Sequence, residues 1–232
     1  MSTDRLELAG PPRVEVRLKR SPRARRLSLR ISRLDGRVTL TAPAHVPRKD
    51  LVAFLEDRSD WVQGHLESQP RAVTVAPGIR LPVEGEGLRL VPAPVRRAER
   101  AGEDLRVAPE RAAAQARAWL MALARERLAE RCDHHAGMLG RGYADLALRD
   151  PRSRWGSCSS AGRLMFSWRL IMAPPQILDY VAAHEVAHLA EMNHSAAFWA
   201  VVAGLHPGYA TDRRWLQQNG AWLHRYRFEA AP

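Results

Sequence analysis

The feature that most constrains this chain is the segment HEVAH, residues 184–188, set within a helical pattern of apolar residues. The apolar positions around it recur at spacings of three and four. This predicts an amphipathic helix that begins at Pro174-Pro175 and runs to about Met192. Residues four apart lie on one face of a helix, so both imidazoles can reach one metal ion at about 2.0–2.1 Å. The pattern therefore predicts a helix that carries two metal ligands.

A third metal ligand must come from outside that helix. His194 follows His188 by six residues, and a continuing helix would rotate it by about 240°. We therefore expect the chain to turn back at Asn193, which tolerates the left-handed conformation that ends many helices. Glu191 is the alternative ligand, but it lies about 10 Å of helix rise beyond His184. We favour His194 and expect Glu191 to orient a ligand.

Three imidazoles would bind one zinc ion per chain and leave it an open coordination position. Neutral ligands leave the full charge on Zn2+, which lowers the pKa of a bound water to about 7. Glu185 lies about 100° round the helix from the first histidine and can take the proton from that water as a general base. The predicted zinc ligands are His184, His188 and His194. Glu185 is the predicted catalytic residue of a zinc-dependent peptidase.

Other polar groups near the motif have less definite roles. A hydrogen-bond donor to the developing oxyanion would assist hydrolysis. The side chains that could supply it are Tyr209, Arg152, Arg154 and Arg169. For each of them we expect an ordinary structural role instead. Cys158 could be a thiolate ligand. Because no histidine is adjacent to it in the sequence, we expect a small packed residue instead.

Two paired strands are predicted before the metal helix, over residues 152–160 and 164–171, on either side of Ala161-Gly162. The second strand lies either at the edge of its sheet or inside it. At an edge it could pair with an extended peptide substrate. The sequence leaves both positions open.

The chain divides into two predicted parts joined by a linker. Residues 1–91 alternate apolar and charged side chains, with a hairpin turn at residues 35–36, which indicates a β-rich N-terminal subdomain with one helix. Residues 92–104 are charged and aperiodic, so we expect a linker there. Residues 105–232 begin with a long helix over residues 109–135 and contain the HEVAH segment. The predicted fold class is α+β.

Composition indicates a globular protein with a basic surface. The net charge is +11, and residues 1–40 contain 11 basic and 4 acidic side chains. This excess could attract nucleic acid, but no aromatic residues interleave with the arginines, so we favour a solvated strand surface. The start of the chain has no apolar signal segment, no apolar run approaches about 18 residues, and there are only two cysteines. We therefore expect a cytoplasmic protein that does not contact a membrane.

The chain resembles the YgjP-like metallopeptidases, which are relatives of the SprT-like proteases. The resemblance is specific over residues 152–199 and rests on five segments: residues 154–160 (RWGSCSS), 168–174 (WRLIMAP), 184–188 (HEVAH), 193–195 (NHS) and 198–199 (FW). It implies a zincin-like fold with a small sheet packed on the metal helix. It also implies zinc binding by the three histidines and a catalytic Glu185. One departure is Ser167, where family members often have Asn.

Two other functions remain open at this stage. The protein could be a nucleic-acid-binding module in which zinc is structural, and Cys158 is then the only thiol near the motif that could complete the site. It could also be a protease that acts on DNA-bound proteins, as the SprT-like relatives suggest. A degenerate, inactive scaffold is a further alternative, but the intact HEVAH segment and His194 argue against it.

Overall fold

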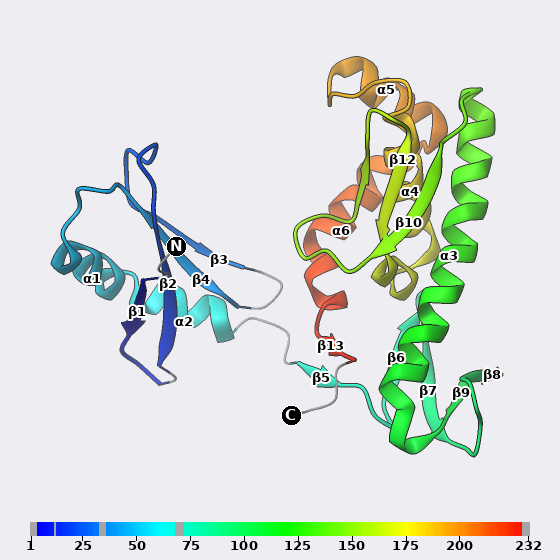
Figure 1. The fold of residues 1–232 in the computed structure, drawn as a ribbon, viewed down its shortest axis with the longest axis horizontal. Coiled ribbons are helices and arrows are strands. Elements are labelled where there is room, and N and C mark those ends of the chain that lie inside the picture. The colour runs from blue at the N-terminus through cyan, green and yellow to red at the C-terminus, as the bar shows by residue number, and fades with distance from the viewer. Residues whose placement is uncertain (1–3, 12, 33–35, 68–71, 229–232) are drawn as a thin grey trace. The chain divides into compact units, whose positions relative to one another are not determined.

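The computed structural model describes residues 4–11, 13–32, 36–67 and 72–228. The contacts within the chain define two compact units, Met1–Arg71 and Ala72–Pro232. Each unit contains both helices and strands (Figure 1). The predicted mixture of helices and sheets is therefore confirmed.

The first unit consists of a four-stranded sheet and two helices. Its strands, in the spatial order β1-β2-β4-β3, are β1 (Arg5–Leu8), β2 (Val14–Arg20), β4 (Val38–Ala42) and β3 (Ser28–Ile31). The helices are α1 (Arg48–Asp57) and α2 (Ser59–Glu67). Alternate strand residues such as Val16 and Leu40 are fully buried with Leu51 of α1. The antiparallel β3–β4 pair confirms the predicted hairpin, although Asp35 of its turn lies outside the described residues.

The second unit begins with a sheet that includes the residues expected to be a linker. In the order β6-β7-β9-β8, its strands are β6 (Arg80–Val83), β7 (Glu86–Pro92), β9 (Asp104–Val107) and β8 (Glu99–Ala101). β7 pairs with β9 in parallel, and β8 pairs with β9 antiparallel. Strand β8 and the connections between β7 and β9 therefore occupy residues 92–104, which corrects the expected linker. Along the chain, the boundary between the two units lies at residue 71 and not at residue 91. Leu88, Leu90 and Leu105 are buried in the core of the second unit.

The long helix α3 (Ala112–Leu139) extends from this sheet to the other end of the unit (Figure 1). A single 3-10 turn over Pro109–Arg111 precedes it, so its predicted start is confirmed. Its end lies beyond the predicted one. Gly137 is inside the helix, and Gly140 ends it in the left-handed conformation at φ 66°.

The remainder of the unit surrounds a central helix. The sheet order β10-β12-β11 comprises β10 (Asp145–Arg149), β12 (Arg163–Ser167) and β11 (Gly156–Cys158). The 3-10 helix Trp168–Met172 leads to α4 (Pro175–Ala187), α5 (Ala196–Leu205) and α6 (Tyr209–Leu223). α4 contacts α3, α5, α6 and β11. β13 (Tyr226–Arg227) pairs in parallel with β5 (Val73–Thr74). Within the described residues, no helix is long and apolar enough to cross a membrane.

Candidate active site

Three histidines converge at the end of α4. His184 lies in the last turn of this helix, His188 is its C-cap residue, and His194 lies in the loop before α5. One nitrogen from each ring lies within 4.8 Å of the other two. The Nε2 atoms of His184 and His194 are 3.2 Å apart. The structure thus brings together the three side chains that the sequence predicts as metal ligands.

The chain reaches this arrangement by ending α4 earlier than predicted. The helix stops at Ala187 rather than near Met192, and backbone bonds from Leu189 to Val186 and from Ala190 to Ala187 tighten the following turn. The expected left-handed conformation of Asn193 is not observed. Among the described non-glycine residues, Glu84 alone has a positive φ.

The loop that carries His194 is held by side chains on both sides of it. The side-chain oxygen Oδ1 of Asn193 accepts a hydrogen bond from the backbone N–H of Ser195. The Ser195 hydroxyl in turn caps α5 by accepting from the N–H of Phe198. The loop therefore enters α5 in a defined conformation, with His194 facing the other two histidines.

The three side chains fit a zinc ion in their spacing and in their charge. Two nitrogens bound to one tetrahedral zinc lie roughly 3.3 Å apart, close to the distance between His184 and His194. Burial, followed by the neighbouring histidines, lowers the pKa of His184 to about 4. Burial also lowers the pKa of His188. Both rings are therefore neutral near pH 7 and have a lone pair free to coordinate.

Glu191 contributes its backbone to the site. Its carbonyl oxygen accepts a hydrogen bond of 3.0 Å from Nδ1 of His188, which leaves Nε2 of that ring for a metal. The Glu191 carboxylate is not part of the metal-binding group among the described residues. Nδ1 of His184 is buried and has no hydrogen-bond partner among them.

Phe198 of α5 lies against all three imidazoles. Its ring centroid is 4.5 Å from that of His188, 4.8 Å from that of His194 and 5.0 Å from that of His184. The Phe198 side chain is completely buried. An apolar ring in this position restricts the three imidazoles without competing for their nitrogens.

Glu185 points from α4 towards the edge strand β11. Its side chain is buried, and a Cβ added at Gly156 would lie 2.5 Å from its Oε1 atom. Only glycine leaves room for the carboxylate at this point of the strand. Burial raises the pKa of Glu185 to about 8, and the positive charge of Arg154 acts in the opposite direction.

The other predicted groups separate into internal and exposed residues. β12 is the central strand of its sheet, so the strand expected either at the edge or inside is internal, and β11 forms an edge. Arg169 is buried, pairs with Asp150 and donates to the carbonyl of Leu223, which confirms the structural role that we expected for it. Cys158 is not part of the metal-binding group, and burial raises its pKa. Arg154 is exposed.

An open cavity of about 790 Å3 lies beside His188. The loop 141–144 and the β11–β12 turn at residues 159–162 form two of its walls, and Leu189 and Met192 complete it. The Met192 side chain is largely exposed. The metal-binding group therefore borders a space large enough for several atoms of a bound chain.

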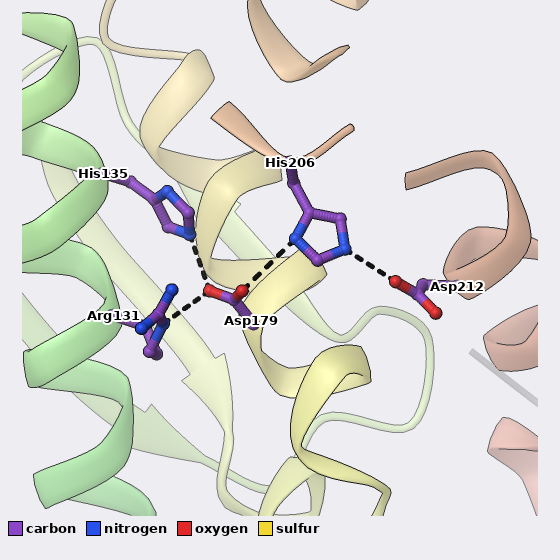
Figure 2. A network of polar contacts seen from close by, with 5 residues as sticks. All are labelled: Arg131, His135, Asp179, His206 and Asp212. Carbon is purple, nitrogen blue, oxygen red and sulfur yellow. Dashed lines mark hydrogen bonds and ion pairs between the residues drawn. The ribbon is translucent and has the colours of Figure 1, made fainter. Parts of the chain in front are cut away.

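A second polar cluster lies at the other end of α4 (Figure 2). Oδ1 of Asp179 accepts hydrogen bonds from Nε of Arg131 at 2.6 Å and from Nε2 of His135 at 2.7 Å. Oδ2 of Asp179 lies 3.3 Å from Nδ1 of His206, whose Nε2 donates to Asp212 at 2.6 Å. The cluster therefore connects α3, α4 and the first turn of α6.

The pKa of Asp179 reflects these partners. Burial alone would raise it, but hydrogen bonds from His135, His206 and Arg131 hold it well below its usual range. The hydrogen bond to Asp179 raises the pKa of His206, and Asp212 adds to this effect. The cluster therefore places the carboxylates of Asp179 and Asp212 against one guanidinium group and two imidazoles.

The fold and this site together define a class, the metallopeptidases. The family described as "YgjP-like, metallopeptidase domain" matches residues 25–219, so the chain belongs to the YgjP-like family. Among solved structures, the chain is similar to the metallopeptidase zymogen abylysin of Pyrococcus abyssi, at 20% identity and a TM-score of 0.36. That match covers 39% of this chain and 93% of the other. No curated protein matches the chain.

Sequence reasoning did not find three features of the site. Phe198 and Gly156 have their roles through contacts between distant segments, and no local pattern indicates such contacts. The cluster around Asp179 draws on residues from positions 131 to 212. The RWGSCSS segment was the one available signal, because its glycine lies inside a predicted strand, where glycine often marks a close approach of another group.

Proposed function

We propose that this protein is a zinc-dependent peptidase in which His184, His188 and His194 hold one Zn2+ and Glu185 is the general base. The convergence of three imidazole nitrogens within 4.8 Å, beside a buried carboxylate, carries the proposal. When bound, zinc would acidify a water molecule and polarise the peptide carbonyl. The family supports a peptide or protein as the substrate.

Glu185 has the environment of a group that both accepts and donates a proton. It would take a proton from the attacking water and pass it to the leaving amine. A pKa near the working pH favours transfer in both directions, and burial brings the pKa of Glu185 to about 8. Gly156 leaves space for the carboxylate between α4 and β11, so the group has a defined position.

The number of ligands favours a catalytic zinc over a structural one. A structural site requires four protein ligands, whereas the metal-binding group within the described part of the chain contains three histidines. We therefore favour peptide hydrolysis over a nucleic-acid module with a structural zinc. Action on DNA-bound proteins, and nucleic-acid binding through the basic residues of the N-terminal region, stay predictions.

Metal analysis and a cleavage assay on matched variants test this function. Wild-type protein should contain one zinc per chain and cleave an unfolded protein. Glu185→Gln should keep the zinc and lose activity by roughly 10²- to 10⁴-fold, because it removes the base and preserves the shape. Glu130→Gln, at an exposed position on α3, is the control and should cleave like wild type. Protein that binds no zinc, or a Glu185→Gln variant with wild-type activity, would overturn the proposal.

A further inference from the structure

Two arginines border the site from different elements, and neither has an acidic partner. Arg154 lies just before β11, and Arg213 lies near the start of α6. Both are exposed. Neither takes part in a hydrogen bond or ion pair with a described residue, and the contact observed for Arg213 is with an aromatic ring. Guanidinium groups are strong, often bidentate ligands for carboxylates.

Arg154 lies two residues before Gly156, the first residue of β11. The Cα hydrogen of Gly156 approaches the Glu185 carboxylate. Trp155, between them, packs on Gly220 of α6. The positive charge of Arg154 also lowers the pKa of Glu185, which is consistent with this placement.

Arg213 is next to the histidines. Its guanidinium carbon lies 4.6 Å from the centroid of Trp199, and that indole lies 5.7 Å from the ring of His184 and 5.9 Å from the ring of His194. The preceding residue, Asp212, is bound by His206 within the cluster of Figure 2. The cluster therefore fixes the helix turn that presents Arg213.

The carboxylates near these arginines are engaged elsewhere. Asp212 binds His206, and Asp150 binds Arg169 in a bidentate pair. Glu185 is buried and belongs to the proposed catalytic machinery. Both guanidinium groups are exposed, and they are complementary to an acidic ligand.

We propose that Arg154 and Arg213 are specificity-determining residues that bind carboxylates of the substrate on either side of the scissile bond. The preferred substrate is then an acidic peptide segment. This inference rests on the proposed peptidase function. The carboxylates could be Asp and Glu side chains or a free chain terminus, and both present the same chemistry to a guanidinium group.

Paired peptides test this preference. The zinc-loaded protein is given two peptides that share one cleavage position. One has Asp and Glu around that position, and the other has Asn and Gln. Each peptide is made with a free and with an amidated C-terminus. Acidic peptides should have a higher kcat/KM, by about fivefold for each arginine at low salt, mainly through KM. Added salt should reduce the difference. A preference that disappears on amidation identifies the terminus as the source, and one that persists identifies side chains.

Variants and a binding measurement separate this inference from the proposed function. Arg154→Gln and Arg213→Gln should each reduce the ratio of acidic to neutral kcat/KM. Arg117→Gln, an exposed arginine of α3, removes the same charge at another place and should keep the wild-type ratio. Fluorescence anisotropy with zinc-loaded Glu185→Gln measures peptide binding without cleavage.

Two outcomes overturn the inference. Equal affinity for acidic and neutral peptides, or an equal effect of Arg117→Gln, would exclude recognition by these two arginines. If wild-type protein still cleaves and Glu185→Gln does not, the peptidase function stands regardless of that result.

Discussion

Two clusters that contain histidines lie at the two ends of α4, and they differ in how their polar atoms are satisfied. At the start of α4, Asp179 is surrounded by donors from α3 and from the segment before α6. At the end of α4, three imidazoles face one another and no carboxylate joins them among the described residues. Buried polar groups are costly unless they are paired. The first cluster therefore stabilises the fold by itself, whereas the second is arranged for a ligand.

This difference implies that mutations in the two clusters change different measurable properties of the protein. Loss of a member of the Asp179 cluster leaves other partly buried polar groups without partners, so it should change the free energy of unfolding. Loss of a histidine at the end of α4 would remove a proposed zinc ligand, so it should change the affinity for zinc.

The largest effect is expected for His194→Ala. Zinc affinity should fall by roughly 10³-fold, since a few ligands share a binding free energy of about 10–16 kcal/mol. The zinc-free variant should unfold within about 1 kcal/mol of wild type, because His194 is exposed. Competition with a zinc chelator and urea denaturation measure the two quantities. A large loss of stability without zinc would contradict the comparison.

A smaller effect, of about 3 kcal/mol in the free energy of unfolding, is expected for Asp179→Ala. The substitution leaves Arg131 and His206 without their shared acceptor. Asp145→Ala, at an exposed position of β10, is the control and should cost less than about 0.5 kcal/mol. Urea denaturation of the zinc-free proteins decides the outcome, and equal midpoints for both variants would count against a structural role of the cluster.

Gly156→Ala should cost about 1–3 kcal/mol of stability and also reduce the cleavage rate. The new Cβ would lie 2.5 Å from Oε1 of Glu185, so either the strand or the carboxylate must move. Zinc content should stay at the wild-type level. Gly137→Ala in α3, where a Cβ meets nothing within 4 Å, should keep full activity and add stability of about 0.5–1 kcal/mol. Full activity in Gly156→Ala would disprove the close contact.

The smallest effect is a dependence of stability on pH that originates at His206. Its pKa is raised in the folded state, so its contribution is fully present below the unfolded pKa of about 6.5 and is lost as pH rises through the folded pKa. The slope contributed by one such group cannot exceed about 1.4 kcal/mol per pH unit. Unfolding of zinc-free wild type and His206→Gln, compared between pH 6 and 9, should show the extra loss in wild type alone.

The sequence predicted those parts of the molecule that depend on local pattern. The spacing of His184 and His188, and the need for a return at His194, are properties of one helix and its end, and the structure brings the three rings together. The early end of α4 was not predicted, because it depends on side-chain contacts such as the donation from Arg141 to the carbonyl of Leu189.

The sheet around residues 92–104 shows the opposite case. β8 contains three residues, two of them exposed and charged, so no apolar alternation marks it as a strand. These residues form a strand because they pair with β9. A strand this short and polar depends on its neighbour for its conformation. The expected linker was therefore placed where the chain in fact continues the fold.

The pairing of β5 with β13 also has a consequence for how the second unit is completed during synthesis. Val73 and Tyr226 are register partners although most of the unit separates them along the chain. The ribosome must therefore deliver nearly the whole unit before this ladder can close. The same proximity of both strands makes the unit a good subject for circular permutation, with a peptide that runs back along the parallel ladder from β13 to β5 and new termini opened in a surface turn.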